Sequence, residues 1–152
     1  LYSGNSRKTQ LEQELGAQLR SLDQLLAEAD FVCLVVPLSD KPRHLISTRE
    51  LGLMKSSAIL INISRGPVVD EPALIEALQT QKIRGAGLDV YEQEPLAESP
   101  LFQLSNAVTL PHIGSATHET REAMANRALD NLRSALLGQR PQDLVNPQVW
   151  KG

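Results

Sequence analysis

Short apolar runs alternate with segments whose apolar residues recur at helical spacing, and this alternation limits the fold more than any other feature. In residues 20–29, for example, Leu22, Leu25 and Leu26 fall on one helical face, and Ser21 stands at the N-cap position. Strands that alternate with helices predict β-α-β units and an α/β fold with an open, doubly wound parallel sheet. The expected strands are residues 30–38, 58–64, 83–91 and 106–112, and the expected helices are residues 20–29, 47–55, 70–82 and 117–138.

The other three expected helices also carry end signals. Ser47 and Glu50 have the spacing of a capping box, and Asp70 with Glu71 suits the N-terminus of the next helix. The long helix is expected to end at Gly138.

Composition excludes several classes of function. The 152 residues, 41% apolar and 22% charged, are typical of a soluble globular domain, and a net charge of −3 offers no basic surface for nucleic acid or an anionic membrane. No apolar run approaches the roughly 20 residues of a membrane span, so we expect a cytoplasmic protein. The strand at residues 30–38 is expected to be covered on both faces, with Cys33, the one cysteine, as a small buried core residue.

Parallel sheets bind ligands beyond the carboxyl ends of their strands. The residues at these ends are therefore expected to gather at one rim, where a cation, a carboxylate and an imidazole would share a crevice. They are Pro37, Ser64, Arg65, Asp89, Pro111 and His112.

Arg65 follows an apolar strand directly and is followed by Gly66, which permits a close approach of backbone. An arginine in such a loop is usually a surface residue. An arginine next to a core strand is also costly to hold without an anion, and its planar guanidinium suits a carboxylate. Two interpretations of Arg65 therefore stay open: a surface residue, or a residue that binds an anionic ligand.

His112 lies between a strand and a helix, with Glu92 and Glu94 near the end of another strand. A carboxylate beside an imidazole keeps the ring protonated, as a general acid requires. Asp89 either caps a turn or accepts hydrogen bonds from a ligand amide. His44 and His118 are interpreted as solvated.

Residues 3–8 follow a short apolar start at the N-terminus. In a dinucleotide-binding sheet an acidic residue near this point holds a ribose hydroxyl. This stretch has Asn5, Ser6, Arg7 and Lys8 instead, which favours an additional phosphate and therefore NADP over NAD.

Three segments closely resemble the signatures of the D-isomer-specific 2-hydroxyacid dehydrogenases. They are "MKSSAILINISRGPVVD" (residues 54–70), "GLDVYEQEP" (residues 87–95) and "LPHIGSAT" (residues 110–117), in the family's order and at similar separations. Within this family, "LYSGNSRK", "PHIGSATHETR" and "LVNPQVW" are most similar to glyoxylate/hydroxypyruvate reductases and 2-ketogluconate reductases.

The resemblance implies roles for individual residues. Arg65 would bind the carboxylate and carbonyl side of a small 2-oxo acid, and His112 would protonate the carbonyl oxygen as hydride arrives from the nicotinamide. Glu94 would pair with His112, which leaves Glu92 as a bystander. The other implied contacts are Asp89 with the nicotinamide carboxamide, Ile63, Pro37 and Gly114 with the cofactor, Ser115 with the substrate, and Asn5, Ser6, Arg7 and Lys8 with the 2′-phosphate of NADP.

The resemblance also implies an organisation in domains. Residues 1–117 would form a Rossmann-type NAD(P)-binding domain that lacks its first β-α unit and its G-x-G-x-x-G loop, and residues 118–152 would return toward a substrate domain. We therefore expect the 152-residue chain alone to bind NADPH weakly and to turn over slowly. Family members are usually homodimers, and the same is expected here.

Two other functions remain open. Some proteins of this fold family are non-catalytic corepressors that sense a dinucleotide, although this acidic chain lacks a basic tail. A dehydrogenase of the phosphoglycerate type is the other alternative.

Overall fold

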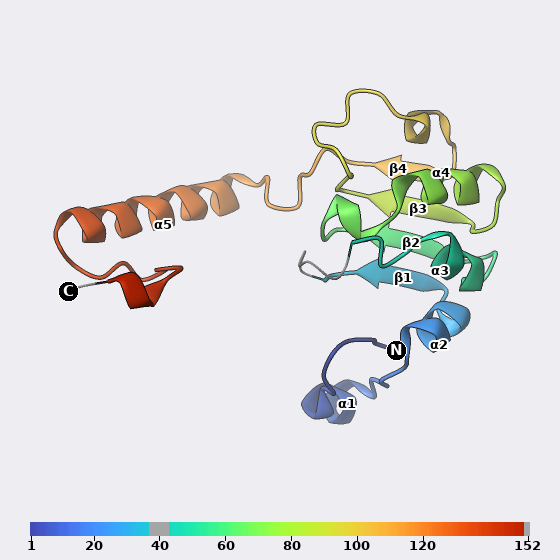
Figure 1. Ribbon diagram of the computed structural model, residues 1–152, viewed down its shortest axis with the longest axis horizontal. Coiled ribbons are helices and arrows are strands. Elements are labelled where there is room, and N and C mark those ends of the chain that lie inside the picture. Colours follow the sequence, from blue (N-terminus) through green and yellow to red (C-terminus); the bar gives the residue numbers. More distant parts are fainter. Residues whose placement is uncertain (37–42, 151–152) are drawn as a thin grey trace. The chain divides into compact units, whose positions relative to one another are not determined.

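The computed structural model describes residues 1–36 and 43–150, which form two compact units, Leu1–His112 and Ile113–Gly152. The first unit contains a parallel sheet of β1 (Phe31–Leu34), β2 (Ile59–Asn62), β3 (Gly85–Leu88) and β4 (Ala107–Thr109), which are neighbours in that order (Figure 1). The predicted parallel α/β sheet is confirmed.

Helices connect these strands, as predicted. α2 (Leu22–Glu28) precedes β1, α3 (Thr48–Leu53) joins β1 to β2, and α4 (Glu71–Gln79) joins β2 to β3. Short 3-10 helices lie at η1 (Gly66–Val68) and η2 (Pro100–Gln103). The sequence patterns did not indicate α1 (Thr9–Leu15), a short helix without a buried residue.

The predicted cap residues are in place. The Ser21 side chain accepts from the N–H of Gln24, and the Asp70 carboxylate accepts from the N–H of Ala73 at 3.1 Å. Glu50 reaches back to the start of α3, where the Ser47 N–H donates to its carboxylate at 3.1 Å. The Ser47 hydroxyl donates to the same carboxylate oxygen.

The hydrophobic core lies on one face of the sheet. Val32, Leu60 and Ala86 are paired across β1, β2 and β3 and are buried. Side chains of α2, α3 and α4 pack on the same core cluster, so these helices cover this face. Its most buried members are Leu26, Ile46, Leu51, Leu60, Leu74, Leu78, Ile83 and Leu101.

The opposite face of the sheet carries exposed apolar side chains. Phe31 is 68% exposed and Val108 64%, and Cys33, on the same face of β1 as Phe31, is also exposed. The predictions of a first strand covered on both faces and of a buried Cys33 are therefore wrong. Strand residues alternate between faces, and the described helices that pack on the core cover only the face of Val32 and Leu34.

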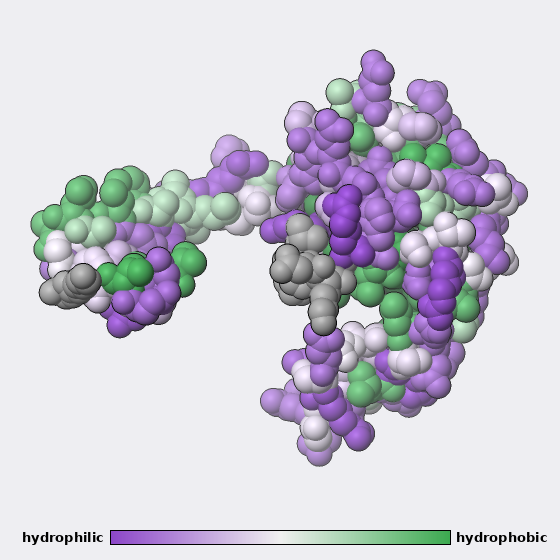
Figure 2. Space-filling model, in the orientation of Figure 1, coloured by the Kyte–Doolittle hydropathy of each residue, from purple (hydrophilic) through white to green (hydrophobic). Residues whose placement is uncertain are grey.

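The second unit is a long helix with a polar tail. Thr117 is the N-cap of α5 (His118–Leu136), and its hydroxyl accepts from the N–H of Thr120. Gly138 follows the end of the helix with φ +69°, as the sequence predicted. Arg127 hydrogen-bonds Asp143 of the tail, which lowers the pKa of Asp143 to about 2. Hydrophobic residues remain exposed along α5 (Figure 2): Met124, Leu129, Leu132 and Leu136.

None of the helices in the described part of the chain combines the length and the apolar character needed to cross a membrane.

Among the glycines of the first unit, Gly66 lies closest to backbone from another segment. A Cβ atom at this position would lie 1.7 Å from the carbonyl oxygen of Tyr91, far inside any allowed contact. The loop after β2 and the segment after β3 therefore touch through backbone, and this contact requires glycine.

We expect Gly66→Ala to lower the free energy of unfolding by about 1–3 kcal/mol because the two backbones must separate. At this chain length, thermal unfolding should show Tm lower by roughly 2–4 °C for each kcal/mol. Gly52→Ala is the control: Gly52 lies in α3 with no atom within 4 Å of the new Cβ, so the variant should be as stable as the parent or more stable. Equal Tm values for Gly66→Ala and Gly52→Ala would contradict the contact.

The hydrogen bonds from Ser47, despite partial burial, lower the pKa of Glu50 from 4.5 to about 2. A carboxylate whose pKa is lowered by folding stabilises the fold above its unfolded value, and this stabilisation is lost as pH falls through the folded value. Urea unfolding from about pH 5 to about pH 2 should therefore show a smaller loss of stability for Glu50→Gln than for the parent. The exposed-site variant Glu98→Gln should follow the parent curve, and a Glu50→Gln curve parallel to the parent would refute the assignment.

Candidate active site

The carboxyl ends of the four strands lie at one edge of the sheet. Leu34, Asn62, Leu88 and Thr109 form one row across the parallel strands. The candidate residues Arg65, Asp89 and His112 follow three of these strand ends, as the sequence predicted. Pro37 lies outside the described residues.

His112 and Glu94 are in direct contact. The imidazole Nδ1 lies 2.6 Å from Glu94 Oε2, and Glu94 Oε1 accepts from the N–H of Tyr91 at 3.0 Å. Both carboxylate oxygens are therefore held, and the predicted contact between Glu94 and His112 is confirmed. His112 has φ +53°, an uncommon backbone conformation for a residue with a side chain.

Tyr91 brings the two partners together. Its hydroxyl lies 2.8 Å from the carbonyl oxygen of Leu110 and 3.2 Å from that of Leu88, so it links the segment after β3 to the segment after β4. Sequence reasoning missed this residue. A buried tyrosine needs a partner for its hydroxyl, and that need was the available signal.

Nearby charges and hydrogen bonds, rather than burial, determine the direction in which the pKa of Glu94 shifts. Burial alone would raise the pKa of Glu94, but the hydrogen bonds with His112 and the Tyr91 N–H and the positive charges of His112 and Arg65 together lower it. Glu94 is therefore a carboxylate at neutral pH, and it presents a negative charge to the imidazole beside it.

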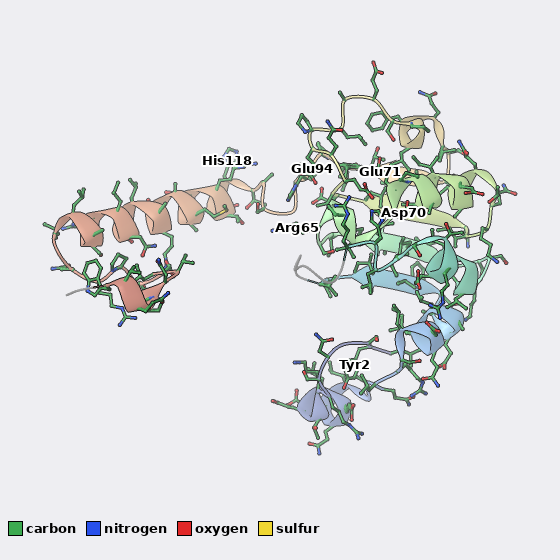
Figure 3. All side chains as sticks on the ribbon, in the orientation of Figure 1. Tyr2, Arg65, Asp70, Glu71, Glu94 and His118 are labelled. Carbon is green, nitrogen blue, oxygen red and sulfur yellow. The ribbon has the colours of Figure 1, made fainter. Side chains whose placement is uncertain are left out.

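Arg65 lies close enough to Glu94 for its positive charge to lower the pKa of Glu94. Both side chains are labelled in Figure 3. Its guanidinium donates to the carbonyl oxygen of Ser64 at 2.7 Å. A guanidinium has five N–H donors, so this bond to a neutral oxygen leaves capacity for an anionic ligand. Arg65 itself is exposed.

Asn62 shapes the turn that carries Arg65. Its side-chain oxygen accepts from the Ser64 N–H at 3.1 Å and the Ser64 hydroxyl at 2.9 Å, and its amide donates to the Arg65 carbonyl at 3.0 Å. Asn62 is 1% exposed and is the single polar residue of β2. Sequence reasoning passed over it, although a polar residue inside an apolar strand needs such partners.

His44 is not the solvated residue that the sequence suggested. It is half-buried, and its Nε2 lies 2.7 Å from Glu92 Oε1. Glu92 is therefore not an isolated bystander, although His112 pairs with Glu94 as predicted. His118 is exposed at the start of α5, as predicted.

The remaining candidates are placed as follows. Asp89 is buried at the end of β3, where its N–H donates to the Asn62 carbonyl at 3.0 Å, and Ile63 is exposed after β2. Gly114 and Ser115 belong to the second unit. The cofactor and substrate roles of these four residues stay predictions.

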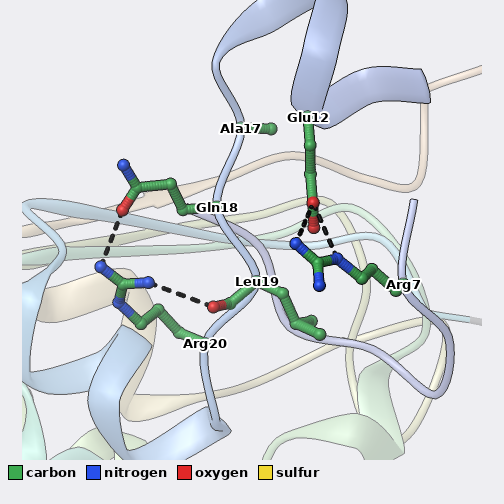
Figure 4. Close-up of a pocket in the computed structure, with 6 residues that line it drawn as sticks. All are labelled: Arg7, Glu12, Ala17, Gln18, Leu19 and Arg20. Atoms are coloured by element: carbon green, nitrogen blue, oxygen red, sulfur yellow. Dashed lines mark hydrogen bonds and ion pairs between the residues drawn. The ribbon is translucent and has the colours of Figure 1, made fainter. Parts of the chain in front are cut away.

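Arg7 lines a cavity of about 370 Å³ near the N-terminus (Figure 4). Its guanidinium binds Glu12 at 2.8 Å, which raises the pKa of Arg7 and lowers that of Glu12. Asn5, Ser6 and Lys8 are exposed beside it. The acidic partner from α1 was missed because the sequence analysis considered only the turn itself. The cavity is lined by Arg7, Glu12, Ala17, Gln18, Leu19 and Arg20.

Comparisons with known proteins agree with this arrangement. The family model for the NAD binding domain of D-isomer specific 2-hydroxyacid dehydrogenases matches residues 1–114. Glyoxylate/hydroxypyruvate reductase B of Serratia proteamaculans is 55% identical in an alignment of 152 positions that covers 99% of this chain and 47% of the relative. The chain thus spans about half the length of the curated relatives that it matches.

Two solved structures share the fold. A protein from Thermus thermophilus is 44% identical with a TM-score of 0.87, covering 95% of this chain and 45% of its own. The second is an NADPH-dependent glyoxylate/hydroxypyruvate reductase from Sinorhizobium meliloti in complex with NADP and malonate. It is 33% identical with a TM-score of 0.81, and the match covers 89% of this chain and 41% of the reductase chain. The prediction of a Rossmann-type fold is confirmed, and the chain belongs to the D-isomer specific 2-hydroxyacid dehydrogenase family.

Proposed function

We propose that this chain supplies the proton donor and the carboxylate-binding arginine of an NADPH-dependent reductase of small 2-oxo acids, which forms D-2-hydroxy acids. The observation that carries the proposal is the Glu94–His112 pair, with Arg65 close enough to influence its charge. Glyoxylate and hydroxypyruvate are the proposed substrates because they appear in the names of the relatives. 2-Ketogluconate is a further candidate substrate.

The proposed chemistry uses three side chains. Arg65 binds the carboxylate of the 2-oxo acid and orients its carbonyl, and His112 donates a proton to the carbonyl oxygen as negative charge develops there. Glu94 keeps His112 protonated before the transfer and holds the ring in place through Nδ1, which leaves Nε2 for the substrate. The bound nicotinamide supplies the hydride.

The sheet edge has features that suit a nicotinamide cofactor. Asp89 is a buried carboxylate at a strand end, which matches the N–H groups of a carboxamide, and Ile63 offers an exposed apolar surface for a flat ring. In the second unit, Gly114 is proposed to pack against the cofactor and Ser115 to contact the substrate.

NADPH is the proposed cofactor, with NADH as the alternative. Arg7 is 71% exposed on its side chain, and exposed ion pairs are weak, so a phosphate can compete with Glu12 for its guanidinium. Asn5, Ser6 and Lys8 are proposed to assist at the same turn. The Sinorhizobium meliloti reductase, described as NADPH-dependent, supports this choice.

The organisation of the protein is also a proposal. Residues 1–117 would hold the cofactor, and residues 118–152 would return toward a substrate domain. Assembly as a homodimer is proposed from the family resemblance.

The general acid is tested in the complete gene product that contains this chain, by following NADPH absorbance with glyoxylate and hydroxypyruvate. His112→Gln should lower kcat by about 10²- to 10⁴-fold because the proton donor is lost. His118→Gln, which changes an exposed histidine, should retain kcat within about twofold. Reduction at the parent rate by His112→Gln would refute the role. NADPH binding without turnover by the parent would favour a dinucleotide-sensing module.

Cofactor choice is tested with two opposite changes at the N-terminal turn. Arg7→Asp should weaken NADPH binding by about 10- to 100-fold and shift preference to NADH, because a charge-assisted hydrogen bond is replaced by repulsion. Glu12→Gln should tighten NADPH binding by about two- to fivefold because it removes the competitor. KM for both cofactors in each variant measures the effect, and unchanged selectivity in both would exclude this turn as the phosphate site.

A further inference from the structure

His44 sits between two carboxylates from different elements. Its Nε2 lies 2.7 Å from Glu92 Oε1, in the segment after β3, and its Nδ1 lies 3.8 Å from Asp70 Oδ2, at the N-cap of α4. Glu71 faces the same group, because its N–H donates to Glu92 and its carboxylate accepts from the Glu92 N–H. The imidazole of His44 thus lies beside a cluster of three acidic side chains (Figure 3 labels Asp70 and Glu71).

The backbone holds His44 firmly in this position. Its N–H donates to the Pro67 carbonyl at 2.8 Å, and Ile46 forms a parallel bridge with Val69. His44 therefore lies beside the loop that begins at Arg65. Its φ of +53° is an uncommon conformation that the surrounding contacts must maintain.

His44 contacts Glu92, which belongs to the same segment as Glu94. Glu92 follows Tyr91, whose carbonyl oxygen lies against Gly66. Two residues further on, Glu94 accepts a hydrogen bond from the Tyr91 N–H. A movement of Glu92 would therefore change both the contact with the Arg65 loop and the position of the carboxylate that bonds His112.

The distances in this cluster suit direct hydrogen bonding better than a shared metal ion. His44, Asp70 and Glu92 each offer a ligand atom, and these atoms lie within 4.8 Å of one another. Ligands of one tetrahedral zinc ion stand roughly 3.3 Å apart, given zinc–nitrogen bonds of about 2.0–2.1 Å. The 2.7 Å between Nε2 and Oε1 is shorter and is a hydrogen-bond distance.

We propose that His44 is a positioning residue for the reductase: through its contacts with Glu92 and Asp70 it connects the segment of Glu94 to the start of α4 and to the loop of Arg65. The inference rests on the proposed function of Arg65, Glu94 and His112. It assigns His44 no contact with substrate or cofactor.

The first test needs no activity and uses the 152-residue chain. Carboxyl ¹³C NMR should show Glu94 titrating below the usual range of glutamate in the parent and closer to that range in His44→Asn, because Glu94 leaves its partners. Asparagine tolerates positive φ, so this variant changes the side chain while sparing the backbone. His118→Asn should leave the Glu94 titration unchanged. A purely structural role for His44 would lower Tm without moving Glu94, and that result would overturn the inference.

The second test uses the kinetics of the complete gene product. His44→Asn and Glu92→Gln should each lower kcat by about tenfold, keep KM for NADPH within about twofold, and move the alkaline limb of the rate profile to lower pH. The double variant should lose no more than either single variant because the two residues act as one unit. Additive losses, or a change confined to KM, would overturn the inference.

The outcomes separate the two proposals. Failure of the parent to reduce any 2-oxo acid would remove the proposed function, while the NMR result would still decide whether His44 positions Glu94. Micromolar binding of Zn²⁺ by the parent chain that is lost in His44→Asn would show a metal site here and overturn the proposed positioning by hydrogen bonds.

Discussion

Parallel pairing of β1, β2, β3 and β4 places all four carboxyl ends at one edge of the sheet, and every candidate group of the first unit's active site depends on this register. Arg65, Asp89 and His112 are separated by more than twenty residues from one another in the chain, yet each follows a strand end. A shift of one residue in any pairing would exchange the faces of that strand and turn buried Asn62 or Leu88 away from the core.

At this edge of the sheet, desolvation and nearby charges shift the pKa of Glu94 in opposite directions. Desolvation alone would raise the pKa of Glu94, but His112, the Tyr91 N–H and Arg65 reverse that effect. The reversal allows a carboxylate, an imidazole and a guanidinium to lie near one another without a net accumulation of one sign. It is also the arrangement expected of a site that binds an anionic 2-oxo acid and then donates a proton.

The loops around these groups are joined by close contacts rather than by an extensive core. Gly66 meets the Tyr91 carbonyl, Tyr91 bonds Leu110, and His44 bonds Glu92. These contacts connect the segments that follow β2, β3 and β4, so a disturbance in one segment reaches the others. The proposed positioning role of His44 is a consequence of this connectivity.

The sequence alone determined the parallel α/β fold, the helix caps at Ser21 and Asp70 and the helix end at Gly138, because periodicity and capping preferences are local signals. The choice of Glu94 rather than Glu92 as the partner of His112 came from the resemblance to a known family, since the residues by themselves left both open. Only the tertiary structure decided that Cys33 is exposed, that Glu12 binds Arg7 and that His44 is held by Glu92. These facts depend on which faces become covered and on which distant side chains meet. The His44–Glu92 contact joins segments 48 residues apart in the chain, which no local pattern connects. Arg7 and Glu12 are only five residues apart, but their contact depends on how α1 follows the turn, which residues 3–8 alone do not show.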